Sequence, residues 1–300
     1  MKKTLLLALL SSMILAACAA TTQPTSTPYI DTGIDPHAWV EIPTGSFLSG
    51  QHDHPASVDY DYQIMQTTVT NQQYADYLNL ALKDGSVKIV NNQVLGYYPG
   101  EPFDGAKHEE EITPGDKLHM DINSPGSRLQ YDGTSFTTLP GYENHPATMI
   151  SWYGAKAYCE SVDGRLPTEA EWEKAARGSD DRAYPWGNTL ERNQANYNSS
   201  QDIFEKILGK GGDTTPVGFY NGKTYDGYQT LDNTSPYGVY DMAGNVWQWM
   251  NDDYPGTHYR FLRGGSKIDY GYNLRIWTRN STVPTYTSPN IGFRCVKVTP

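Results

Sequence analysis

The segment that decides the fold is Gly164–Gly178, which reads GRLPTEAEWEKAARG. It predicts a short helix, because Thr168 can cap the first turn and Glu171 can complete a capping box with it. Acidic residues lie at the positive end of this helix, Arg177 lies in its last turn, and Gly178 can end it. The segment therefore predicts a helix with defined ends in the middle of the chain.

The N-terminus predicts an exported, lipid-anchored protein. An apolar run over residues 5–15 follows two lysines, and Leu15–Cys18 matches the bacterial lipoprotein signal. Such a run is typical of a cleaved signal peptide, here residues 1–17. We expect a lipid on Cys18 that inserts into the membrane of the bacterial cell envelope. Because Ala19 follows, resemblance to known lipoproteins implies the outer membrane. The alternative is an ordinary signal with an incidental cysteine.

Composition predicts a tether followed by one acidic domain. Residues 18–36 are predicted to form a flexible tether, because they are rich in Thr, Pro, Gln and Ser and nearly uncharged. The folded domain is expected over residues 37–300. The net charge of −11 argues against nucleic acid as a ligand. The 23 tyrosines and 28 glycines suit a loop-rich domain with polar aromatic surfaces.

Local patterns predict further elements. Thr70 and Ser151 each precede a helical pattern as candidate N-caps, and residues 130–136 resemble a hairpin on an Asp-Gly turn. Few long helices, many short strands and Gly/Pro turns together favour an irregular α+β domain. Besides Cys18, the chain holds Cys159 and Cys295. An even pair in an exported protein suggests a disulfide.

Several motifs resemble the formylglycine-generating enzyme (sulfatase-modifying factor) family. Besides Gly164–Gly178, they are Trp39–Phe47, Tyr237–Trp249, Arg263–Ser266 and Asn290–Cys295. The resemblance extends from about Trp39 to Val298. It implies a loop-rich α+β fold, a large variant of the C-type lectin fold, and a disulfide between Cys159 and Cys295.

The oxidase chemistry of that family is not expected in this chain. By resemblance, it depends on copper held by a cysteine pair soon after the Arg263–Ser266 motif. Residues 267–294 contain no cysteine, and Cu(I) prefers soft thiolate ligands. We therefore predict no catalytic residue and no copper. A formylglycine-generating oxidase or related sulfatase-modifying enzyme with an altered site is kept as an alternative.

Calcium is the cofactor that the resemblance implies. The ligands of a first site would be Asp241, Gly244, Val246 and Gln248. A weaker second site would use Asn196 and the backbone carbonyl of Tyr197. Gln248 stands where the family usually has Glu, which should weaken binding, since calcium prefers carboxylate oxygens. The alternative is that Gln248 forms hydrogen bonds in an ion-free turn.

The segment after Arg263–Ser266 is predicted to bind a ligand. Small polar residues and Tyr on a fixed scaffold are typical of binding surfaces that recognise many partners. The candidates are Ser266, Asp269, Tyr270, Tyr272, Asn273, Trp277, Asn280, Tyr286 and Asn290. This arrangement also resembles the variable proteins of diversity-generating retroelements. Ordinary polar surface loops are the alternative.

Three hypotheses for the function result. The first, which we favour, is a lipid-anchored envelope protein that binds an envelope or extracellular protein or a glycan without catalysis. The second is a hypervariable ligand-binding protein of a diversity-generating retroelement. The third is the altered enzyme. The fold alone names no ligand, so the choice depends on the site.

Overall fold

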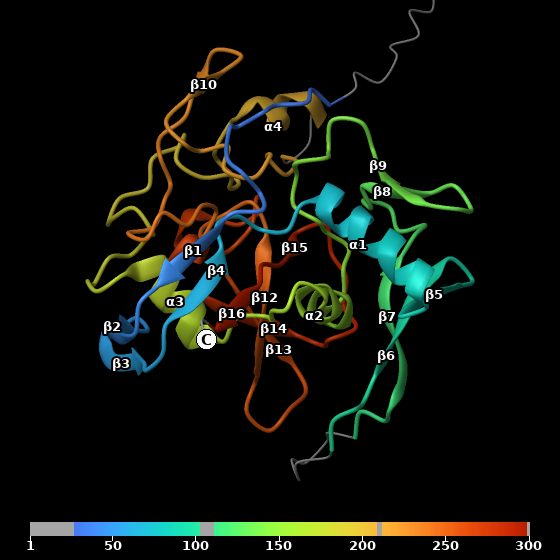
Figure 1. The fold of residues 1–300 in the computed structure, drawn as a ribbon. Helices are drawn as coiled ribbons and strands as arrows, with labels where there is room; N and C mark the ends of the chain where they lie inside the picture. Colours follow the sequence, from blue (N-terminus) through green and yellow to red (C-terminus); the bar gives the residue numbers. More distant parts are fainter. Residues whose placement is uncertain (1–26, 103–110, 209–211, 299–300) are drawn as a thin grey trace, which may run out of the picture.

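The computed structural model describes residues 27–102, 111–208 and 212–298 (Figure 1). Its helices are α1 (Asn71–Asp84), α2 (Trp152–Ser161), α3 (Glu169–Arg177) and α4 (Ile203–Leu208), with the 3₁₀ helix η1 (Gly271–Leu274). Its strands are β1 (Trp39–Ile42), β2 (Gly45–Ser49), β3 (His54–Val58), β4 (Tyr62–Met65), β5 (Val87–Val90), β6 (Gln93–Tyr98), β7 (Gly115–Asp121), β8 (Leu129–Tyr131), β9 (Phe136–Thr138), β10 (Thr224–Tyr225), β11 (Tyr228–Gln229), β12 (Trp247–Asp253), β13 (Arg260–Arg263), β14 (Arg279–Thr282), β15 (Ile291–Gly292) and β16 (Val296–Val298). Short strands and few helices confirm the predicted irregular α+β class.

The strands form several small sheets rather than one large sheet. A four-stranded sheet has the order β14-β13-β12-β15, and a three-stranded sheet has the order β1-β4-β16. In the second sheet Ile64 of β4 pairs with both Val40 and Val296. The beginning and the end of the domain therefore lie side by side (Figure 1).

The helices begin where their capping residues predict. Thr70 and Gln73 form a capping box at α1, and Thr168 and Glu171 form one at α3. The Ser151 side chain accepts a hydrogen bond from the first turn of α2. These caps satisfy N–H groups that the helix itself cannot pair, which explains why local sequence was sufficient to locate them.

A disulfide between Cys159 and Cys295 connects α2 to the segment before β16. Both residues are completely buried, in the cluster that holds Tyr74, Tyr158 and Phe293. The Tyr158 and Phe293 rings pack edge to face with centroids 5.5 Å apart. The cross-link therefore lies inside the main core rather than on a loop.

The packed domain begins earlier than predicted. The predicted tether ended at residue 36, but Ile30 packs on a core cluster and the buried Thr32 donates from Oγ1 to the carbonyl of Val217, 3.0 Å away. Ile34 contacts Gly218 so closely that a Cβ there would lie 2.7 Å from it. Ile30 and Ile34 are apolar side chains within a mostly polar stretch, and both pack on the domain. Residues 1–26, which include the predicted signal and Cys18, lie outside the described part of the chain. Within the described part, no helix meets the length and apolarity of a membrane span.

Two buried histidines should make the fold sensitive to acid. Burial lowers the pKa of His119 to about 4 and that of His145 to about 3, against about 6.5 in an unfolded chain. The unfolded state therefore binds more protons as the pH falls below about 6.5, and the folded state loses up to about 1.4 kcal/mol per pH unit for each histidine. We expect the midpoint of thermal unfolding to fall between about pH 6.5 and about pH 4.

The variant His145→Asn isolates one of these two contributions. Its side chain can keep the bond to Thr214 Oγ1, which lies 2.9 Å from Nδ1 of His145, while removing the titrating group. The variant should lose stability less steeply with acid than the wild type. His52→Asn, at an exposed histidine, should leave the slope unchanged. An equal slope in all three proteins would contradict the assignment.

Candidate functional site

The loop after β13 is shaped by two glycines in the left-handed region. Gly264 has φ 97° and Gly265 has φ 71°. A Cβ on Gly265 would lie 2.9 Å from the Leu274 side chain and 3.0 Å from the carbonyl oxygen of Asn273. Only glycine tolerates both the backbone conformation and this close approach. The two glycines therefore place Ser266 beside η1.

Asp269 is the centre of the hydrogen bonds in this loop. Its Oδ2 accepts from the Ser266 hydroxyl at 2.5 Å, from the Ser266 backbone N–H at 2.9 Å and from Trp247 Nε1 at 2.9 Å. Its Oδ1 accepts from Asn273 Nδ2 at 2.9 Å. Ser266 is buried. This carboxylate is occupied by four donors that hold the loop together, and the Ser266 hydroxyl is one of them.

Lys267 connects this loop to the last motif. Its Nζ donates to the Pro289 carbonyl oxygen at 2.9 Å and to Asn290 Oδ1 at 2.5 Å. Burial lowers the pKa of Lys267 to about 8. The structure thus brings together four predicted candidates, which are Ser266, Asp269, Asn273 and Asn290. It adds Trp247 and Lys267, which sequence reasoning did not propose.

Tyr270 and Tyr272 project from this loop into solvent. Each is 60% exposed, and their rings are nearly parallel, with an interplanar angle of 11° and centroids 6.3 Å apart. The backbone between them is anchored, because Tyr184 donates from its hydroxyl to the carbonyl oxygen of Gly271 at 3.1 Å and Leu274 is buried. The two rings therefore form an exposed aromatic surface, here called the tyrosine pair.

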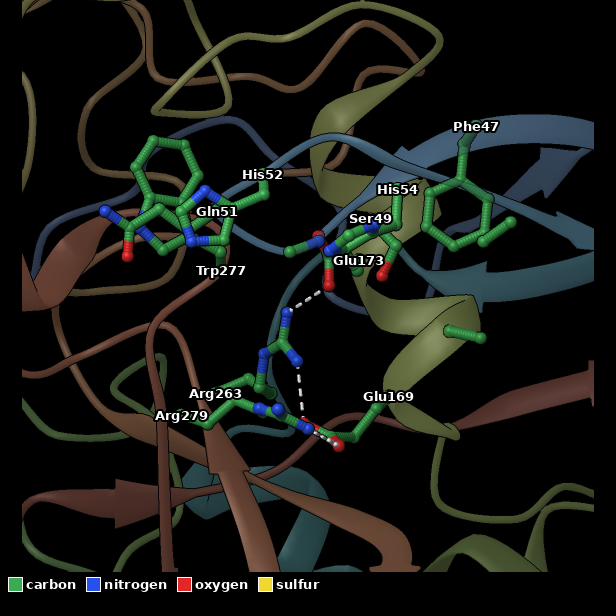
Figure 2. Close-up of a pocket in the computed structure, with 13 residues that line it drawn as sticks. Phe47, Ser49, Gln51, His52, His54, Glu169, Glu173, Arg263, Trp277 and Arg279 are labelled. Atoms are coloured by element: carbon green, nitrogen blue, oxygen red, sulfur yellow. Dashed lines mark hydrogen bonds and ion pairs between the residues drawn. The ribbon is translucent and has the colours of Figure 1, made fainter.

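The other predicted ligand residues lie elsewhere. Trp277 lines a hollow between the β2–β3 hairpin, α3 and β14 (Figure 2). Asn280 lines a neighbouring hollow with Tyr254. Tyr286 is exposed on the segment after β14. The nine candidates therefore do not form one surface. Arg279 lines both hollows and was not among the predicted residues. No strand periodicity connects Arg279 with Trp277, because Trp277 lies in a turn and β14 begins only at Arg279.

The predicted calcium turn is buried and already rich in hydrogen bonds. Asp241 Oδ2 accepts from the Gly218 backbone N–H at 2.7 Å, and its Oδ1 accepts from Asn233 Nδ2 at 3.3 Å. Gln248 donates from Nε2 to the Asp241 carbonyl oxygen at 2.9 Å, and its Oε1 accepts from Trp172 Nε1 at 2.8 Å. Gly244 and Val246 lie on the same buried segment.

A buried guanidinium already supplies positive charge at this turn. Arg294 Nε donates to Gln248 Oε1 at 2.7 Å, and Nη2 donates to the carbonyl oxygens of Tyr240 at 2.7 Å and Asp241 at 3.2 Å. Burial lowers the pKa of Arg294 to about 9 and raises that of Asp241. A calcium ion bound through Gln248 would have to share that oxygen with this cation. The fit to calcium is therefore poor here, and the site stays a prediction.

Asn196 fits a cation better. Its Nδ2 donates to the Asp213 carbonyl oxygen at 2.8 Å, whereas its buried Oδ1 has no hydrogen-bond partner in the described part of the chain. A buried unpaired amide oxygen is an available ligand for a hard cation. No group of three or more His, Cys, Asp or Glu in residues 27–102, 111–208 and 212–298 could hold a metal ion. The second calcium site, with Asn196 and the carbonyl of Tyr197, also stays a prediction.

Comparison with known proteins places the chain in a family. Residues 30–299 match the sulfatase-modifying factor enzyme 1-like domain. The chain belongs to this family. Mouse formylglycine-generating enzyme is 29% identical over 319 residues, which cover 93% of this chain and 81% of that protein. Mouse inactive C-alpha-formylglycine-generating enzyme 2 is 39% identical over 158 residues, 50% of this chain and 48% of that protein. This chain spans about a third to a half of the length of the first curated relatives that it matches.

Solved structures show the same fold. CarF matches 88% of this chain and 98% of its own with a TM-score of 0.55 and 20% identity. Treponema denticola variable protein 1 matches 87% of this chain and 95% of its own with a TM-score of 0.51 and 19% identity. At these identities the likeness concerns the fold. The chain therefore has the irregular, C-type lectin-like α+β fold of the sulfatase-modifying factor family.

Proposed function

We propose that this member of the sulfatase-modifying factor family is a non-catalytic, lipid-anchored envelope protein that binds a protein or glycan partner through the tyrosine pair. The exposed, nearly parallel rings of Tyr270 and Tyr272 carry this proposal. Tyrosine supplies a large amphipathic contact area at a small cost in conformational entropy. Because the backbone between the rings is anchored, little further ordering is needed on binding.

The surroundings of the tyrosine pair support binding rather than oxidation. The positions that follow Ser266, residues 267–273, offer no thiolate to hold copper. The Asp269 carboxylate is engaged by four donors. One relative of this chain is itself named as an inactive formylglycine-generating enzyme. The loop therefore has the features of a rigid support for exposed side chains.

The location of the protein is part of the same proposal. Cleavage before Cys18 and lipidation of that residue would tether the domain to the bacterial envelope, in the outer membrane. The partner would then be an envelope or extracellular protein or glycan, and not a nucleic acid, since the chain is acidic. Globomycin, which blocks cleavage of lipoprotein signals, should shift the protein to its uncleaved mass if this is correct.

The double variant Tyr270→Ser/Tyr272→Ser tests the binding surface. We expect its binding to envelope extracts to fall by about tenfold or more, because aromatic anchors that become buried at an interface dominate binding energy. Its thermal unfolding should match the wild type, since both rings are exposed. Tyr97→Ser, at a tyrosine that is 69% exposed on β6, is the matched control and should bind normally.

The wild-type protein tests the prediction that oxidase chemistry is absent. Incubated with copper, oxygen and a cysteine-containing sulfatase peptide, it should leave the peptide mass unchanged. A copper-dependent mass loss that corresponds to formylglycine would contradict the non-catalytic proposal. Equal binding by the double variant and the wild type would contradict only the role of the tyrosine pair.

A further inference from the structure

Two hollows meet at Arg279, at a place that the proposed function does not use. Each has a volume of about 580 Å³. The first lies against α3 and the β2–β3 hairpin and includes Trp277. The second includes Tyr254, Phe261 and Asn280. Because the Arg279 side chain lines both, one chain-like ligand that crosses it can occupy the two hollows together.

The first hollow is built on fixed ion pairs (Figure 2). Arg263 donates from Nη1 to Glu169 Oε1 and from Nη2 to Glu173 Oε2, both at 2.7 Å. Arg279 donates from Nη1 to Glu169 Oε2 at 3.0 Å. Arg263 and Glu173 are buried, so these orientations do not depend on the ligand. The hollow therefore presents planar polar groups that are already in place.

These ion pairs leave the first hollow without net charge. Behind it, Arg177 pairs with Asp53 at 2.8 Å and with Glu173 at 3.2 Å. The three guanidinium groups, of Arg177, Arg263 and Arg279, are thus matched by the three carboxylates of Asp53, Glu169 and Glu173. A charged ligand would gain little from such a balanced set. The hollow is suited to a neutral ligand with many hydroxyl groups.

Each hollow also has an aromatic wall. The Trp277 ring lines the first hollow, and its centre lies 5.4 Å from the Arg177 guanidinium and 5.8 Å from the Arg275 guanidinium. In the second hollow Tyr254 is 51% exposed and its ring centroid lies 5.7 Å from that of Phe261. The Arg279 guanidinium stacks over Phe261 at 5.3 Å. Aromatic walls with a few fixed polar groups are typical of ligand sites.

We propose that the paired hollows bind a neutral oligosaccharide chain that lies across Arg279. One sugar ring packs on Trp277, another packs on Tyr254, and Arg279 donates hydrogen bonds to the hydroxyl groups between them. Aromatic faces match the C–H faces of sugar rings, and planar guanidinium and carboxylate groups match pairs of neighbouring hydroxyls. The site shares no residue with the tyrosine pair and stands whether or not that pair binds a partner.

A peptide added to the sheet is a less suitable occupant. β14 is an edge strand, and an extended peptide can pair with such an edge. However, the backbone N–H of Ser281 already donates to Asn280 Oδ1 at 2.8 Å. A peptide strand that paired through this amide would have to displace that side chain. A saccharide needs no free backbone group and leaves this bond intact.

Titration calorimetry on the folded full chain tests the proposal. The probes are neutral gluco-, manno- and chito-oligosaccharides, each from the disaccharide to the hexasaccharide. We expect at least one series to bind, with an affinity that rises with chain length. The variants Trp277→Ala and Arg279→Ala should each bind the hexasaccharide about tenfold more weakly than the wild type does. In Tyr254→Ala, the affinity should no longer rise with the length of the oligosaccharide, whereas the affinity for the disaccharide should stay unchanged.

The controls distinguish the loss of this site from the loss of another binding site and from misfolding. Arg279 is 56% exposed in its side chain and Tyr254 is exposed, so their variants should melt like the wild type even if Trp277→Ala does not. Tyr270→Ser/Tyr272→Ser should bind the oligosaccharides normally. No binding by any series at about 5 mM would overturn the proposal. So would tighter binding of a heparin hexasaccharide, or Arg279-dependent binding of peptides from a random heptapeptide library.

Discussion

Replacing both disulfide cysteines, as Cys159→Ala/Cys295→Ala, should lower the free energy of unfolding by about 4–5 kcal/mol. The two residues are 136 positions apart in sequence. In the chain-entropy treatment, a cross-link that closes so long a loop removes a large part of the conformational freedom of the unfolded state. Both cysteines are completely buried, so the cross-link should be intact in the native protein.

Urea unfolding of the oxidised wild type and the double variant measures this effect. The wild type with its disulfide reduced in the unfolded state is the control, and it should refold with the stability of the double variant. A midpoint that is the same with and without the bond would contradict the prediction. Alkylation of both cysteines in the unreduced, unfolded wild type would show that the bond does not form.

Arg294→Met should cost about 3–5 kcal/mol of stability, because it removes a buried charge that many groups need. The guanidinium donates to Gln248 Oε1 and to the carbonyl oxygens of Met65, Gln66, Tyr240 and Asp241. Methionine has a similar length and no donor, so these buried oxygens lose a partner. The buried Asp241 carboxylate also loses the nearby cation that opposes the rise in its pKa.

Arg279→Met is the matched control for this variant. Arg279 is largely exposed and makes one surface ion pair with Glu169, so its loss should change stability by no more than about 0.5 kcal/mol. Chemical denaturation of the two variants beside the wild type compares them directly. Similar midpoints for both variants would show that the Arg294 network does not stabilise the fold.

Local sequence was a sufficient guide wherever both partners of an interaction lie within a few residues. The capping pairs Thr70–Gln73 and Thr168–Glu171 form as predicted, and the hairpin over residues 130–136 appears as β8 and β9. These interactions need only a short stretch of chain, so they depend on residue type and spacing. The motifs were also sufficient to predict the family and the α+β class.

The candidate site was predicted only in part, because the candidates do not share one surface. Ser266 and Asp269 form one network with Trp247, whereas Trp277 lines a hollow with Arg279. Neighbouring positions in a loop can point in different directions, and no periodic pattern orders them. Residues that are close in the sequence were therefore predicted to form one site, although the folded backbone holds them apart.

By itself the sequence determined the family, the helix ends and the absence of the thiolates that copper chemistry needs, since each depends on residue identity along a short stretch. Only the tertiary structure decided which side chains act together. It placed Arg294 against Gln248, 46 positions away, and Arg263 against Glu173, 90 positions away. Such pairs form when distant segments pack into one core, and the resulting burial sets both their strength and their partners.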